Sequence, residues 1–187
     1  IAIVSPYGMS TVIFTKTLSL LLDENGHKVF TISPYNGYQN EIDQIKSKHL
    51  FTDFSLGFSP IRDLIHIFKI RKFITQNKIN LLITFTTKPN IFIPAYLFAK
   101  KNVFSLMAVR GLGRIYSPRK NTFLSIFKII LLDSLYKLSL SKTNCLWCTN
   151  SSDKEYLKKL LKIKNLKTII TRNSIDLNFY KTSKAIR

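Results

Sequence analysis

Three short segments of the sequence hold residues suited to binding anions or sugars. They contain, in order, Gly8, Met9 and Ser10; Thr86, Lys88 and Asn90; and Arg110, Gly111, Gly113 and Arg114. Their hydroxyl, amide, ammonium and guanidinium groups donate the hydrogen bonds that phosphate, carboxylate and sugar oxygens accept. The glycines allow positive φ or close approach of the backbone. We therefore predict that these segments contact a polar ligand.

Each of the three segments follows a short apolar run that is typical of a buried strand. Seven such runs alternate with helical patterns, at 1–5, 28–33, 50–56, 80–85, 103–109, 145–149 and 166–171. This alternation predicts an α/β fold: a Rossmann-like, doubly wound, mainly parallel sheet of six or seven strands with helices on both faces. Ligands bind beyond the carboxyl ends of the strands in such sheets, which is where the three segments lie.

Capping signals predict where several helices begin. Ser10 is expected to cap a helix that ends near Glu24, and Ser152 to form a capping box with Glu155. Pro89 is expected to keep Lys88 out of helical geometry, so that Asn90 caps the next helix.

The sequence predicts neither a metal site nor a redox site. His49 and His66 have no cysteine, carboxylate or histidine partners at the spacing of metal ligands, and His27 is expected to be structural at a turn after Gly26. Cys145 and Cys148 lie in a predicted strand, where their side chains point to opposite faces and cannot form a disulfide.

The chain is strongly basic, with 29 Lys and Arg against 10 Asp and Glu, a net charge of +19. Such a field attracts nucleic acid, anionic lipid or phosphorylated substrates, although many lysines simply solvate a surface. An apolar, basic helix expected at 121–142 suggests a surface that lies on an anionic membrane; packing in a core is the alternative. No helix-turn-helix, zinc-finger or ribonucleoprotein pattern supports nucleic-acid binding.

Several motifs, in order, resemble the N-terminal domain of family-4-like GT-B glycosyltransferases of bacterial surface polysaccharide synthesis. The segment 84–92 resembles their T-x-K-P-N-I-[YF] motif, and 108–113 resembles their Gly-Leu-Gly loop. The matching motifs elsewhere are Glu-x-Gly-His-x-Val at 24–29, Asn-x-x-Asp at 150–153 and a segment at 172–179 that leads into a second domain.

The resemblance implies transfer of a sugar from a nucleotide-sugar donor, with retention at the anomeric carbon and without another cofactor. The acceptor is expected to be a saccharide linked to polyprenyl diphosphate, and the protein to lie in the cytoplasm on the inner face of the cell membrane. No catalytic residue is assigned, because Thr84 and Thr86 stand where many relatives have histidine.

The resemblance also implies that the chain is half of an enzyme. Residues 1–172 are expected to form the acceptor-side domain, and 173–187 the start of a linker to a donor-binding domain. Because the chain begins without Met, inside a predicted strand, we expect it to be a piece of a longer protein and inactive alone. A basic nucleic-acid-binding module or a non-catalytic ligand-binding module is the alternative.

The basic residues of the three segments are expected to share one acceptor site. We predict that Lys88, Arg110 and Arg114 surround a cleft together with Gly8 and Gly111. In the alternative, Arg110 pairs with an acid such as Asp133 and only holds its loop in place.

Overall fold

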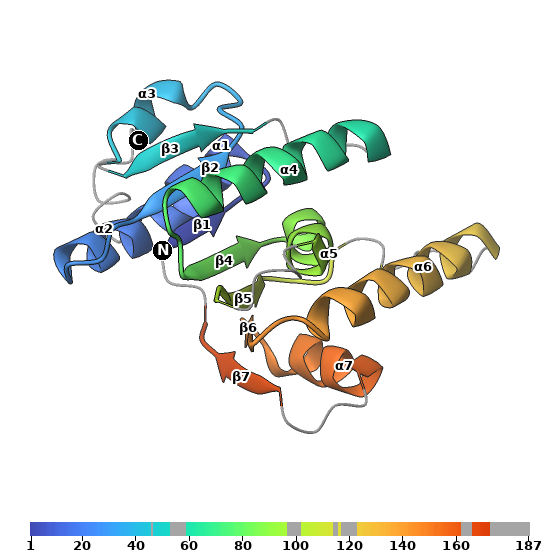
Figure 1. The fold of residues 1–187 in the computed structure, drawn as a ribbon. Helices are drawn as coiled ribbons and strands as arrows, with labels where there is room; N and C mark the ends of the chain where they lie inside the picture. Colours follow the sequence, from blue (N-terminus) through green and yellow to red (C-terminus); the bar gives the residue numbers. More distant parts are fainter. Residues whose placement is uncertain are drawn as a thin grey trace, which may run out of the picture.

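The computed structural model describes residues 1–45, 47–52, 59–96, 102–113, 116, 123–161 and 166–172. Within these residues, seven parallel strands form one sheet in the order β3-β2-β1-β4-β5-β6-β7, seen from top to bottom in Figure 1. The strands are β1 (Ala2–Val4), β2 (Phe30–Ser33), β3 (Lys48–Phe51), β4 (Leu81–Phe85), β5 (Phe104–Val109), β6 (Cys145–Cys148) and β7 (Lys167–Ile170). The predicted α/β fold with a parallel sheet is confirmed.

Helical segments connect the strands. They are α1 (Gly8–Ser10), the π-helix η1 (Thr11–Thr15), α2 (Lys16–Glu24), α3 (Gln39–Asp43), α4 (Pro60–Gln76), α5 (Thr87–Tyr96), α6 (Phe123–Leu140) and α7 (Ser151–Leu161). The α3 helix lies in the polar stretch 34–48, between β2 and β3. Residues 173–187, the predicted linker, lie outside the described residues.

Side chains alternate between the two faces of the sheet, as the period of a strand requires. On one face, Ala2 and Leu82 pack with Ile70 of α4, and Met107 packs with Leu132 of α6. On the other face, Ile3 and neighbouring strand residues pack against Leu18 and Leu22 of α2. Helices therefore cover both faces, and α4 and α2 lie on opposite ones.

The structure corrects the predicted start of the first helix. It begins at Gly8, and Ser10 is a buried residue inside it. Tyr7 occupies the N-cap position and makes no side-chain cap hydrogen bond.

The start of α5 also differs from the prediction. Because α5 begins at Thr87, Lys88 and Pro89 lie in its first turn, where proline is tolerated since no backbone donor is needed. Asn90 is therefore not a cap. Its fully buried side chain donates from Nδ2 to the carbonyl oxygen of Ala108 in β5, at 2.9 Å.

Asn90 also links α5 to α6 through its own carbonyl group. Pro94, four residues further on, has no N–H to donate to this carbonyl within the helix. The buried hydroxyl of Ser139 in α6 donates to it instead, at 2.5 Å. The proline thus creates a polar contact that fixes the packing of α5 against α6.

The cap of α7 lies two residues earlier than predicted. The side-chain oxygen of Asn150 accepts a hydrogen bond from the backbone N–H of Asp153 at 2.8 Å, and its Nδ2 donates to the Asp153 carboxylate, also at 2.8 Å. Asn150 and Asp153 therefore fill the roles expected of Ser152 and Glu155. An Asn at this position reaches the free N–H groups as well as a Ser does.

Candidate functional site

The segment with Gly8, Met9 and Ser10 contributes mainly to packing. A Cβ atom on Gly8 would overlap the carbonyl oxygen of Tyr35, and the Gly8 N–H donates to Oδ1 of Asn36 at 3.3 Å. Since Ser10 is buried, Met9 is the member of this segment whose side chain is exposed. The loop after β2 therefore occupies the space next to Gly8 that the sequence assigned to a ligand.

Lys88 forms an ion pair with a buried acid. Its Nζ lies 2.7 Å from Oδ1 of Asp63, in the first turn of α4, and the Asp63 side chain is only 4% exposed. The other Asp63 oxygen accepts the backbone N–H of Ser59 at 3.4 Å. A buried carboxylate needs such a partner, so Lys88 has a structural role whether or not it meets a ligand.

Arg110 is held between two aromatic rings. Its guanidinium carbon lies 4.7 Å from the ring centre of Phe14, on the π-helix η1, and 5.1 Å from that of Phe85 at the end of β4. One terminal nitrogen donates to the Phe14 carbonyl oxygen at 3.5 Å. Burial lowers the pKa of Arg110, and the two rings stabilise its charge through cation–π contact.

Lys88 and Arg110 contact different elements in the described part of the chain. Lys88 is bound to α4, whereas Arg110 lies against Phe85, which faces the side of the sheet that α2 covers. Among the described contacts, the Asp133 carboxylate accepts hydrogen bonds from two tyrosines and forms no ion pair with Arg110. Arg114, the third basic residue of the predicted cleft, lies outside the described residues.

A cavity of about 570 Å³ lies beyond the carboxyl ends of β5 and β6. Its walls come from the loop after β5 and from the start of α7: Gly111, Leu112, Gly113, Tyr116, Asn150, Ser152, Asp153 and Tyr156. Gly111 and Gly113 have φ of 139° and 87°, values that favour glycine. These two predicted site residues therefore do line a cavity at the expected edge of the sheet.

The second segment meets this loop at one point. A Cβ atom on Gly113 would lie 3.9 Å from the hydroxyl oxygen of Thr87, the first residue of α5. The preceding residue, Thr86, is half-buried and has a φ of 68°, unusual for a residue with a branched side chain. Thr87 thus brings the start of α5 next to the loop that follows β5.

Two tyrosines share one carboxylate beside the cavity. The hydroxyl of Tyr116 donates to Oδ1 of Asp133 at 2.9 Å, and that of Tyr156 lies 2.9 Å from both Asp133 oxygens. Desolvation and the Asp133 carboxylate raise the pKa of Tyr156 to about 12 and also raise that of Tyr116. Both hydroxyls therefore remain protonated at neutral pH.

The sequence analysis did not assign this tyrosine–carboxylate group to a site. Asp133 is the only acid in the apolar segment 123–140, and an acid in such a helix needs a polar partner. This requirement was the feature of the sequence that could have indicated a polar group at this position. It does not identify Tyr116 and Tyr156, which are 17 and 23 residues away along the chain.

The remaining candidate features are reported for the described residues. Cys145 and Cys148 are buried free thiols. Among the described residues, no group of three or more His, Cys, Asp or Glu side chains could hold a metal ion. Likewise, no helix in this part of the chain is long and apolar enough to cross a membrane.

Comparison with known proteins does not place the chain in a family. No protein-family model matches it, and no curated protein matches it significantly. Because a Rossmann-like fold supports many activities, the chemistry of the site must guide a functional proposal.

Proposed function

We propose that the chain is the N-terminal, acceptor-side half of a retaining glycosyltransferase that builds bacterial surface polysaccharide. The observation that carries the proposal is the cavity formed by the Gly111–Gly113 loop at the carboxyl edge of the sheet. The same loop belongs to the ordered motifs that resemble GT-B glycosyltransferases. A parallel sheet with a cavity at this edge suits a substrate site.

The proposed reaction needs a donor half in addition to this chain. The bond between the anomeric carbon and the nucleotide diphosphate breaks, and the same carbon forms a bond to the oxygen of an acceptor hydroxyl, whose proton passes to the departing diphosphate. Negative charge develops on the departing diphosphate, which requires positive groups held in place around it. We assign those groups to the second half, and the acceptor to the half described above.

We further propose that the protein lies on the inner face of the cell membrane, where a lipid-linked acceptor would be found. The supporting feature is α6, whose first half projects beyond the sheet at the right of Figure 1. Its side chains include Phe123, which is 88% exposed, and exposed Phe127 and Ile130. Exposed apolar groups beside lysines suit an anionic membrane surface.

The test of the proposed activity uses the full-length polypeptide that contains this chain. It is incubated with nucleotide sugars and with polyprenyl-diphosphate-linked saccharides, and products are detected by mass spectrometry. We expect sugar transfer, and we expect Gly111→Val to abolish it while nucleotide-sugar binding is kept, because a branched side chain disfavours a φ of 139°. Binding of nucleotide sugar without transfer to any of these acceptors would contradict the proposal.

A further inference from the structure

We infer that the cavity beside Tyr116 and Tyr156 binds a neutral, hydroxyl-rich ring, such as one sugar unit, and that it does not bind a phosphate group. The assignment of this sugar to the acceptor rests on the proposed function. The chemistry of the cavity wall supports this class of ligand independently of the proposed function. This cavity differs from the basic cleft that the sequence predicted.

The size of the cavity is suited to a small molecule. Ligand pockets usually enclose about 300–1,000 Å³, and this cavity of about 570 Å³ lies within that range. Because Gly111 and Gly113 have no side chains, the backbone groups at these two positions of the loop are not covered by side chains of their own. A Cβ atom on Gly111 would meet nothing within 4 Å, so the loop is open on that side.

The polar groups of the wall both donate and accept hydrogen bonds. The Tyr116 and Tyr156 hydroxyls give their protons to Asp133, which leaves their lone pairs to accept. Asn150 uses one of its two amide protons for Asp153, and Ser152 adds a hydroxyl. A sugar hydroxyl can use both kinds of group, whereas a phosphate mainly accepts and an ammonium only donates.

Two carboxylates belong to the described surroundings of the cavity. The Asp153 carboxylate lines it, the Asp133 carboxylate lies behind the two tyrosines, and no lysine or arginine is among its described lining residues. Both carboxylates oppose the binding of a phosphate group. The two described cations that the sequence assigned to an anion, Lys88 and Arg110, are held by Asp63 and by aromatic rings.

An aromatic face completes the wall. The Tyr156 side chain is partly exposed, and its ring meets that of Tyr116 edge to face with centroids 5.3 Å apart. Tyr116 in turn lies 6.4 Å from the ring of Tyr136, which is fully buried. Tyr156 is therefore supported from behind and can present its ring to the C–H face of a sugar.

The experiment is an amide NMR titration of ¹⁵N-labelled residues 1–187. The probes are N-acetylglucosamine, methyl α-glucopyranoside, methyl α-galactopyranoside and rhamnose, each added up to tens of millimolar. Inorganic pyrophosphate and methylamine are added to separate samples. We expect at least one sugar to shift the amide signals of Gly111, Gly113, Asn150 and Asp153, and neither pyrophosphate nor methylamine to do so.

Two variants test the residues assigned to the site. Tyr156→Phe keeps the ring and removes one acceptor, so we expect about threefold to tenfold weaker binding of that sugar, as for one lost hydrogen bond. Ser152→Ala should act in the same direction. Tyr38→Phe, beside α3 at the far end of the sheet, is the matched control and should leave the affinity unchanged.

The outcomes separate this inference from the proposed function. If no sugar shifts these amides, if pyrophosphate or methylamine shifts them instead, or if Tyr156→Phe binds as well as Tyr38→Phe, the inference is overturned. A well-dispersed spectrum of each variant shows that it is folded. Sugar binding here without transfer by the full-length protein would contradict the proposed function and leave the cavity assignment standing.

Discussion

Position 8 requires glycine because the backbone of the loop after β2 occupies the space that a side chain would need. We predict that Gly8→Ala destabilises the chain by about 1–3 kcal/mol, as overpacking usually does, since the added methyl group would overlap the Tyr35 carbonyl. The measurement is urea unfolding followed by circular dichroism.

A second glycine provides the comparison for this variant. Gly26 has a φ of 80° but open space around it, so Gly26→Ala should cost only the strain of the left-handed conformation, about 1 kcal/mol. Equal stability of Gly8→Ala and the unchanged chain would show that the loop after β2 moves away easily.

Lys88 offers a similar test of an ion pair. We predict that Lys88→Met destabilises the chain by about 3 kcal/mol, because it leaves the Asp63 carboxylate buried without its cation. Adding Asp63→Asn removes that charge and should restore part of the loss. Thermal unfolding of the two single variants and the double variant measures the coupling. Additive losses would show that the pair is not coupled.

Burial of two tyrosines predicts a loss of stability in alkali. The pKa values of Tyr136 and Tyr156 are raised to about 12 from 10.0, so the folded chain holds these protons more tightly than the unfolded chain. This contribution is complete below pH 10 and is lost as the pH rises from about 10 to about 12.

Ultraviolet titration of tyrosinate checks the two raised values, and urea unfolding at several pH values checks their effect on stability. Tyr156→Phe should remove one of the late-ionising groups. If all tyrosines ionise together near pH 10 while the chain is still folded, the hydrogen bonds to Asp133 are not kept in solution.

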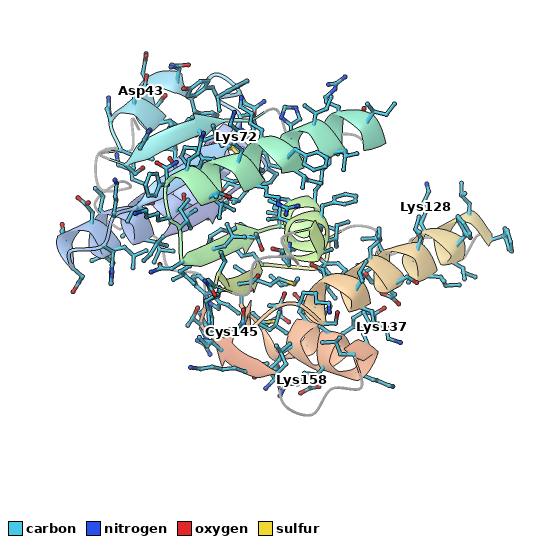
Figure 2. All side chains as sticks on the ribbon, in the orientation of Figure 1. Asp43, Lys72, Lys128, Lys137, Cys145 and Lys158 are labelled. Atoms are coloured by element: carbon cyan, nitrogen blue, oxygen red, sulfur yellow. The ribbon has the colours of Figure 1, made fainter. Side chains whose placement is uncertain are left out.

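The α6 helix is where membrane attachment should be measured. We predict binding to vesicles that contain anionic lipid, weakened by salt, because each basic residue near such a surface adds about 1 kcal/mol. Lys128 stands on the projecting part of α6 in Figure 2, so Lys128→Glu should weaken sedimentation with vesicles by about tenfold or more.

A matched charge change controls for the high net charge. Lys72 is an exposed residue on α4, as Figure 2 shows, and Lys72→Glu should reduce binding much less. Equal effects of the two variants would mean that attraction is spread over the whole surface. Equal binding to neutral vesicles would contradict the electrostatic explanation.

The elements were more predictable than the contacts of the site. Short apolar runs in the sequence predict the seven strands, because a strand of a parallel sheet, such as Leu81–Phe85, is apolar on both faces. The start of α5 was mistaken because the position of Pro89 within a helix, not its presence alone, decides whether the preceding residue is helical. The partners of Lys88, Arg110 and Asp133 depend on which face each element covers, and local sequence does not contain that information.

At the level of the whole molecule, we predict that residues 1–187 transfer no sugar alone. The described part of the chain places Lys88 and Arg110 in structural contacts, which leaves neither arranged for a leaving diphosphate. The check is product formation by the purified chain with nucleotide sugars and lipid-linked saccharides. Adding the donor-binding half should restore transfer, and turnover by the chain without it would contradict the division into halves.

The strand order has a consequence for how the chain emerges from the ribosome. Of the seven described strands, β1 is made before the others and stands inside the sheet, between β2 and β4. The strands β3, β5, β6 and β7 each pair with a strand that precedes them in the chain. Every strand after β1 therefore finds a neighbour that has already been synthesised. The nascent sheet can widen outward during translation, with no strand waiting for a partner still inside the exit tunnel.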